Sequence, residues 1–188
     1  MQEEELQTGN LFGDAKREIY LDIETLRLSD EVSGGWSNIK DFGLAVAVTW
    51  DETNGFRRWY ESDAARLLEE LKGFRRIITF NGERFDFEVL RGYGDTSKLY
   101  PNSLDLLVEL KRILGFRVKL ESVARETLGK SKTGVGTDAV KWWRAGDKEK
   151  VAAYCEQDVQ LLRELVTFAR ANGHVVADGK KVRVDWKE

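Results

Sequence analysis

Acidic side chains occur in three separate segments of the chain, and their types and spacing suit the binding of divalent cations. Asp22 and Glu24 lie two residues apart in Glu18-Ile-Tyr-Leu-Asp-Ile-Glu24, whose short apolar run is typical of a buried strand. Because alternate strand residues project from one face, both carboxylates point the same way. Two like charges this close need a cation, solvent or a raised pKa. Taken alone, the pair equally suits a strand that ends in water.

The second segment is Asn81-Gly-Glu-Arg-Phe-Asp86, where a predicted strand at 76–80 runs into a short predicted helix at 83–93. Gly82 allows a sharp backbone turn. Asp86 falls in the first helical turn, at the carboxyl end of the sheet, where ligands gather in α/β folds. An acidic residue in the first turn also complements the helix dipole, so this segment alone has an ordinary structural explanation.

The third segment is Ala153-Tyr-Cys-Glu-Gln-Asp-Val159, within a helix predicted from 147 to 171. A spacing of four puts the Tyr154 phenol and the Asp158 carboxylate on one helix face. Because apolar residues of the same helix lie nearby, a carboxylate there needs compensation. The alternative interpretation is a buried tyrosine whose hydroxyl finds a partner, beside a surface aspartate.

Composition restricts the metal chemistry to oxygen ligands. Cys155 is the only cysteine and His174 the only histidine, which excludes an internal disulfide framework and a cysteine-based zinc cluster. Carboxylate ligands favour Mg²⁺ or Mn²⁺. With 188 residues, 41% hydrophobic and 34% charged, the chain has the size and composition of a soluble single domain. It has no apolar run of membrane-spanning length and no secretory signal pattern, so we expect a cytoplasmic protein without a membrane partner.

The hydrophobic pattern predicts an α/β layer fold with a mixed β-sheet flanked by helices. Asn54-Gly55 and Asp178-Gly179 predict hairpin turns. We expect an acidic flexible tail at 1–16, the main domain at 17–173, and a C-terminal hairpin at 174–188 that packs on the domain or extends it. The predicted strands are 18–24, 39–50, 56–60 and 76–80, and the predicted helices are 62–72, 83–93, 104–114, 120–128, 140–143 and 147–171.

The net charge of −3 argues mildly against a general basic surface for nucleic acid. Two local basic patches are present, and each equally suits a solvated face or a flexible loop. Trp36, in Ser33-Gly-Gly-Trp36, is either an interface contact or an ordinary lid residue. The patches comprise Lys111, Arg112, Arg117 and Lys119, and Lys130 with Lys132.

In this order and combination the three segments resemble the motifs of the DEDD exonuclease superfamily, in its tyrosine-containing (DEDDy) branch. Asp22-Ile-Glu24-Thr25 matches the first motif, Asn81 to Asp86 the second and Tyr154-Cys-Glu-Gln-Asp158 the third. The superfamily has a ribonuclease H-like fold, which ribonuclease D-like enzymes and polymerase proofreading domains share. Residues 139–159 are similar to prokaryotic ribonuclease H-like exonuclease domains often found with helicases. Asp105, in Ser103-Leu-Asp-Leu-Leu107, matches a family segment with a supporting role.

The resemblance implies a 3′–5′ exonuclease that hydrolyses phosphodiester bonds of single-stranded nucleic acid, with DNA somewhat favoured over RNA. It implies two Mg²⁺ or Mn²⁺ ions, the first held by Asp22, Glu24 and Asp158 and the second by Asp22 and Asp86. Tyr154 would position the attacking water. The implied substrate contacts are Thr25, Asn81 and Phe85, and Trp142 and Trp143 either stack on bases or pack in the core.

The resemblance also leaves alternatives open. A helicase or another repair or processing protein is the kind of partner that it implies. The chain can instead be a catalytically weak or partner-dependent nucleic-acid-binding module. A structure-specific endonuclease of the same fold is the third interpretation.

Overall fold

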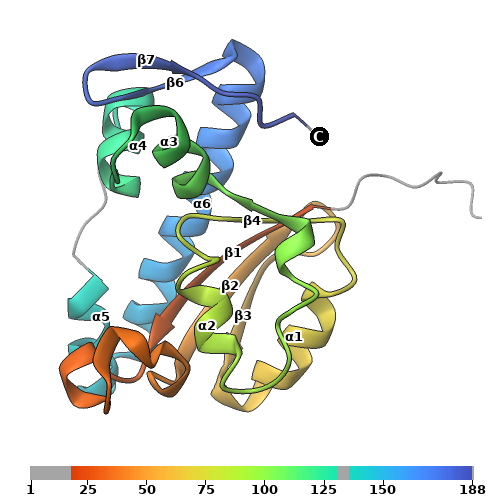
Figure 1. Ribbon diagram of the computed structural model, residues 1–188. Helices are drawn as coiled ribbons and strands as arrows, with labels where there is room; N and C mark the ends of the chain where they lie inside the picture. Colours follow the sequence, from red (N-terminus) through yellow and green to blue (C-terminus); the bar gives the residue numbers. More distant parts are fainter. Residues whose placement is uncertain (1–17, 131–135, 188) are drawn as a thin grey trace, which may run out of the picture.

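A five-stranded mixed sheet forms the centre of the molecule, whose computed structural model describes residues 18–130 and 136–187 (Figure 1). The strand order is β3-β2-β1-β4-β5; the β1–β2 and β2–β3 pairs are antiparallel, and the β1–β4 and β4–β5 pairs are parallel. The predicted mixed sheet flanked by helices is thereby confirmed. The strands are β1 (Glu18–Thr25), β2 (Leu44–Asp51), β3 (Gly55–Tyr60), β4 (Arg76–Thr79) and β5 (Ser103–Asp105).

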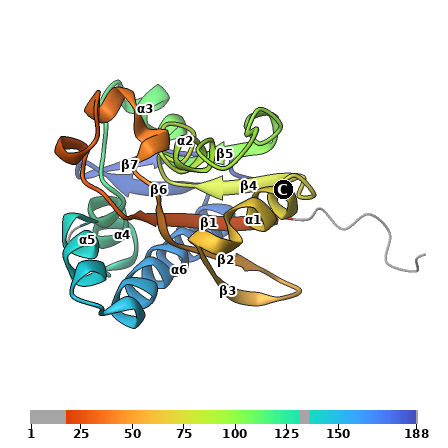
Figure 2. The ribbon, with the colours of Figure 1, turned by 90° about the horizontal axis from the view of Figure 1, so that it is seen from below.

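Helices cover both faces of the sheet. The long helix α6 (Lys148–Asn172) packs across β1 and β2, with α3 (Leu106–Leu114) and α4 (Leu120–Leu128) completing that layer. On the opposite face lie α1 (Ala64–Leu71) and α2 (Asp86–Leu90). Seen from below, the arrowhead of β1 points toward α4 and α5 (Gly136–Arg144) (Figure 2).

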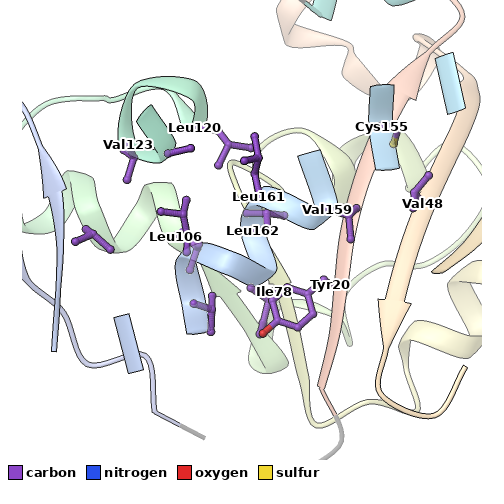
Figure 3. Packing of buried hydrophobic residues seen from close by; sticks show 14 of the residues in the cluster. Tyr20, Val48, Ile78, Leu106, Leu120, Val123, Cys155, Val159, Leu161 and Leu162 are labelled. Carbon is purple, nitrogen blue, oxygen red and sulfur yellow. The ribbon is translucent and has the colours of Figure 1, made fainter. Parts of the chain in front are cut away.

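The alternation of β1 divides its side chains between two cores. Tyr20 belongs to the first core, on the α6 side of the sheet, whereas Ile19 and Leu21 belong to the second core, on the side of α1 and α2. On the α6 side, Tyr20 and Ile78 lie close to Val159 and Leu162 (Figure 3). Each fully buried aliphatic side chain of this kind stabilises the fold by about 1.5–3 kcal/mol. The same alternation carries Asp22 and Glu24 to the α6 face, since they follow Tyr20 at intervals of two.

Several predicted element boundaries were wrong. The segment 39–43 was predicted as the start of a strand, but Ile39–Asp41 form a 3₁₀ helix that buries Ile39 and Phe42 against the second core, and β2 begins only at Leu44. The helix predicted at 83–93 shortens to α2, and the one predicted at 140–143 extends to α5. Strand β5 was not predicted, because its three residues directly precede a helical pattern.

The C-terminal residues form the predicted hairpin. Strands β6 (His174–Ala177) and β7 (Lys180–Arg183) pair antiparallel, and the φ angles of 54° at Asp178 and 70° at Gly179 are those of a tight hairpin turn. The hairpin packs beside α4, where the Val176 amide donates to the Thr127 hydroxyl at 2.9 Å (Figure 1). The expected tail at 1–16 lies outside the described residues. None of the helices that the structure describes has an apolar stretch of the length needed to cross a membrane.

Candidate functional site

A cavity of about 830 Å³ opens where the carboxyl ends of β1, β4 and β5 meet. Ligands of open α/β sheets collect at this edge. Residues from α3, α4, α5 and α6 complete its wall. All eight site residues expected from the sequence line this cavity: Asp22, Glu24, Thr25, Asn81, Phe85, Asp86, Tyr154 and Asp158.

Three carboxylates converge at the inner end of the cavity. Asp22 and Glu24 project from β1 toward α6, which presents Asp158, and one oxygen from each of the three lies within 4.8 Å of the others. Glu24 is 9% exposed and Asp158 only 4%. Like charges held this close and this far from water repel strongly, and a divalent cation offsets that repulsion.

The fourth acidic residue, Asp86, lies in the same cavity but outside this group of three. It is 4% exposed in the first turn of α2, and its Oδ1 atom has no hydrogen-bond partner among the described residues. Burial, together with the charges of Asp22 and Asp105, raises the pKa of Asp86 well above its ordinary value. A buried carboxylate oxygen without a donor, facing further carboxylates, is the environment that a bound cation would satisfy.

The donor set therefore fits a hard divalent cation. Asp22, Glu24, Asp86 and Asp158 offer only oxygen ligands, as Mg²⁺ and Mn²⁺ prefer. Cys155 lies next to them, and burial, together with the nearby Asp22 carboxylate, raises the pKa of its thiol well above the ordinary value. The protonated Sγ donates to the backbone oxygen of Asp22 at 3.2 Å and to its Oδ2 at 3.3 Å.

Tyr154 lines the cavity one helical turn before Asp158. It is 4% exposed, and the edge of its ring meets Trp142 of α5 at a centroid distance of 5.7 Å. Trp143 packs against Tyr60 instead, and both tryptophans lie on the first core and outside the cavity lining. The two tryptophans were expected either to stack on bases or to pack in the core. In the structure both of them pack, and the contact with Trp142 restrains the Tyr154 ring.

The turn that carries Asn81 and Asp86 is held by Asp105, whose carboxylate is 2% exposed. Its Oδ1 accepts from the Asn81 amide at 2.8 Å and its Oδ2 from the Glu83 amide at 3.1 Å. The same side chain caps α3 by accepting from the Leu107 amide. Asp105 thus fixes the turn without lining the cavity, in keeping with a supporting role.

Asn81 and Gly82 contribute to this turn in different ways. The left-handed residue is Asn81, with φ of 73°. Gly82 is required for space, because a Cβ there would stand 2.4 Å from the Thr79 side chain. The sharp turn was predicted at Gly82, but Gly82 is the site of a close approach, and the left-handed backbone angle occurs one residue earlier.

The outer end of the cavity is basic and aromatic. Its lining there includes four exposed side chains, those of Arg27, Trp36, Arg117 and Lys119. The Arg117 guanidinium donates to Asn81 Oδ1 at 2.7 Å. From the sequence, Arg117 and Lys119 were placed in a basic patch and Trp36 was expected to be an interface contact or a lid residue, whereas Arg27 had no motif to mark it. In the other patch, Lys130 pairs with Glu164, and Lys132 lies outside the described residues.

Comparison with known proteins agrees with this architecture. The RNase_H superfamily model matches residues 19–170. Among the solved structures that match is the family B DNA polymerase from the hyperthermophilic archaeon Pyrobaculum calidifontis, at a TM-score of 0.63 and 13% identity. The match covers 83% of this chain and 25% of the polymerase chain, so this chain spans about a quarter of that protein's length. At this identity the likeness shows the fold alone. No curated protein sequence matches the chain.

Proposed function

The chain belongs to the RNase H superfamily, and from that premise we propose that it is a metal-dependent 3′–5′ exonuclease of single-stranded nucleic acid, with DNA somewhat favoured over RNA. The observation that carries the proposal is the convergence of Asp22, Glu24 and Asp158 within 4.8 Å, in a cavity that also contains Asp86 and Tyr154. This combination supports assignment to the tyrosine-containing branch of the DEDD exonucleases.

The four carboxylates are the proposed ligands of two Mg²⁺ or Mn²⁺ ions. Asp22, Glu24 and Asp158 hold the first ion, and Asp22 and Asp86 the second. The unsatisfied Oδ1 of Asp86 supports its part in this set. When bound, such cations activate water and relieve charge on the phosphate and on the departing oxygen. The Cys155 thiol restrains Asp22 by donating to its Oδ2.

Tyr154 is the proposed positioning residue for the attacking water. The hydroxyl of a phenol both donates and accepts hydrogen bonds, so it can hold a water molecule in one position. The packing of Trp142 against its ring limits the orientations that the hydroxyl can take. A fixed water near the phosphorus atom lowers the entropic cost of the attack.

The proposed contacts to the terminal nucleotide are Thr25, Asn81 and Phe85, which line the cavity beside the carboxylates. The exposed cations Arg117 and Lys119 stand at the outer end, where they suit the phosphates of the strand that follows. Nothing in this set distinguishes a 2′-hydroxyl, and the family that the chain resembles acts on both polymers, so the activity test compares DNA with RNA.

We also propose the domain bounds, the partner and the compartment of the enzyme. Residues 17–173 would form the exonuclease domain and 174–188 a hairpin appended to it. A helicase or another repair or processing protein in the cytoplasm would supply the 3′ ends. Because the matched polymerase chain is far longer than this one, the proposal concerns the activity of this chain alone.

Degradation of a 5′-labelled single-stranded DNA and of its RNA counterpart with Mn²⁺ tests the proposal. We expect a ladder of shortening products from the wild type. Asp22→Asn should lower the rate by ~10³-fold or more, because cation stabilisation is worth several kcal/mol and each ~1.4 kcal/mol is a factor of ten. Asp30→Asn is the matched control, since Asp30 lines the cavity from the 3₁₀ helix Ser29–Glu31, where it is exposed and outside the carboxylate group.

Two further measurements separate the proposal from its alternatives. Circular single-stranded DNA should stay intact, and its cleavage would indicate an endonuclease instead. Mn²⁺ should raise the melting temperature of the wild type but not of Asp22→Asn, because a ligand that binds only the folded state stabilises it. Intact linear substrates together with no thermal shift would leave a nucleic-acid-binding module as the better interpretation.

A further inference from the structure

Trp36 is the most exposed large apolar side chain in the part of the chain that the structure describes. It is 60% exposed, although indole is among the side chains that gain most from burial. It lines the same cavity as the carboxylates, at the outer end. Ligand sites are typically cavities lined by apolar and aromatic side chains, so the place of this indole in the cavity, rather than its exposure alone, suits a role in binding.

The indole is held in this exposed position by its own loop. Gly34 and Gly35 have φ angles of 84° and 50°, a left-handed region that glycine enters without strain. The Ser37 amide donates to the Gly34 carbonyl at 3.0 Å and the Asn38 amide to the Gly35 carbonyl at 2.9 Å, which closes the 3₁₀ helix Gly35–Ser37. The backbone on both sides of Trp36 is thus hydrogen-bonded, and its presentation is preorganised.

Two phenylalanines support the indole from beneath. The centroid of Trp36 lies 5.6 Å from that of Phe42, at an interplanar angle of 62°, and 6.1 Å from that of Phe85, at 48°. Phe42 is 2% exposed and anchors this aromatic group in the second core. The ring of Trp36 therefore rests on Phe42 and Phe85 while its other surface remains open to the cavity.

The position of this group relative to the carboxylates defines what can occupy it. Phe85 directly precedes Asp86, so the indole stands over the residue next to a proposed metal ligand. Arg27 lines the cavity as a nearby cation. A nucleotide whose phosphate lies among the carboxylates and their cations has its base within the same cavity. Aromatic side chains stack on any base, at ~1–3 kcal/mol per base, and without sequence preference.

We propose that Trp36, resting on Phe42 and Phe85, forms a stacking subsite for an unpaired nucleobase of the substrate strand. The subsite rests on the proposed nuclease function and adds to it a residue that binds the base rather than the phosphate. A base in a duplex already has stacked neighbours and a pairing partner, so it reaches the indole only by leaving them. Any base that stacks on Trp36 raises the affinity for the strand, so the subsite distinguishes an intact nucleotide from an abasic one.

A cycle between Trp36 variants and base-free substrates tests the subsite. The oligonucleotides are single-stranded and carry one abasic nucleotide at the last, second or third position from the 3′ end. For the wild type, kcat/KM should fall roughly ten-fold at the stacked position, and Trp36→Ala should lower kcat/KM on the intact strand by a similar roughly ten-fold factor. Combining the two should cost no more than either alone, and Trp36→Phe should retain most of the preference.

Phe56→Ala is the matched control. Phe56 is 37% exposed on β3, away from the cavity lining, so its removal should leave the abasic discrimination unchanged. If Trp36→Ala discriminates against abasic ends as strongly as the wild type does, the subsite is refuted. A change in self-association by sedimentation with unchanged discrimination would likewise refute it, in favour of a protein contact.

The same cycle in equilibrium binding separates this inference from the proposed function. Fluorescence anisotropy of labelled oligonucleotides measures affinity whether or not the chain cuts them. A wild type that binds but does not cut would contradict the exonuclease proposal, and a loss of affinity shared by Trp36→Ala and the abasic strand would still support stacking. Equal affinities for intact and abasic strands in every variant would reject it.

Discussion

The two ends of the cavity are built on different parts of the fold. The inner end consists of carboxylates on a central strand and two helices, with Asp86 and Asp158 each 4% exposed. The outer end consists of exposed side chains on connections, including Trp36 on a 3₁₀ turn and Lys119 just before α4. Charge also divides them, since the inner end is acidic and the outer end basic and aromatic.

This difference separates the proposed chemistry from proposed substrate binding. Ligands of a cation must keep their positions closely, and elements buried on both sides provide that rigidity. Contacts to a flexible strand need reach and solvent exposure, which loops provide. Substitutions at the inner end should therefore affect turnover and folding together, whereas those at the outer end should affect affinity and leave the fold intact.

The largest effect is expected from Asp86→Asn at the inner end. The amide keeps the size of the side chain but loses a proposed metal ligand, so we expect turnover to fall by ~10³-fold. In metal-free protein the same change should raise stability at neutral pH, because it removes a buried carboxylate whose ionisation burial, Asp22 and Asp105 all oppose. Thermal melting with and without Mn²⁺, beside the rate measurement, checks both effects.

The pH dependence of this stability has a definite sign. The pKa of Asp86 is raised in the folded protein, so its proton binds more tightly there than in the unfolded chain. Its contribution to metal-free stability is fully present below the ordinary carboxyl pKa of about 4 and is lost as pH rises through the raised pKa. The melting temperature of the wild type should therefore fall relative to that of Asp86→Asn above about pH 4. A constant difference across pH would contradict this explanation.

Tyr154→Phe should produce the next largest effect, a loss of ~10²-fold in kcat, the lower end of the range for a positioned proton-handling group. The metal-induced thermal shift should remain, because the phenol is outside the proposed ligand set. The pH–rate profile separates two roles. If the hydroxyl only orients water, the pH–rate profile of the variant keeps the shape of the wild-type profile. If the hydroxyl is a general base, the variant loses the limb of the profile that reports its ionisation.

Tyr60→Phe is the control for this comparison. Tyr60 is a partly buried tyrosine on β3 that packs against Trp143 and lies outside the cavity lining. Removing its hydroxyl should leave kcat near the wild-type value. Equal losses in the two variants would mean that a general weakening of the packing around α5, and not the position of one hydroxyl, governs the rate.

The inner end could be predicted from sequence because its geometry follows from local rules. Strand alternation fixes the shared face of Asp22 and Glu24, and helical spacing fixes that of Tyr154 and Asp158. The order of these elements also predicts the α/β fold with a mixed sheet, which the structure confirms. What local rules do not fix is the convergence of the segments, which depended on the family resemblance.

The outer end could hardly be predicted from the sequence, because local rules do not fix the contacts that hold it in place. Trp36 obtains its position from two left-handed glycines, from Phe42 six residues later, and from Phe85, which is distant in sequence. Asp105 was recognised as supporting, but its hydrogen bonds to the amides of Asn81 and Glu83 require the pairing of β4 with β5, a strand that was not predicted. Contacts that join separate connections leave no periodic trace in sequence.

The smallest effect is expected from Lys119→Ala at the outer end. Lys119 is exposed and lines the cavity, so its ammonium can neutralise a substrate phosphate but holds nothing in the fold together. Each phosphate contact on a single strand contributes about 0.7 to the slope of log affinity against log salt, because it releases condensed counterions. We expect a several-fold weaker affinity at low salt, a slope reduced by about that amount, and unchanged melting temperature and kcat. Lys180→Ala, on the distant hairpin with a side chain 76% exposed, should change none of these quantities. An equal change in slope for both variants would mean that the strand responds to overall charge and that the outer end of the cavity has no particular role in guiding it.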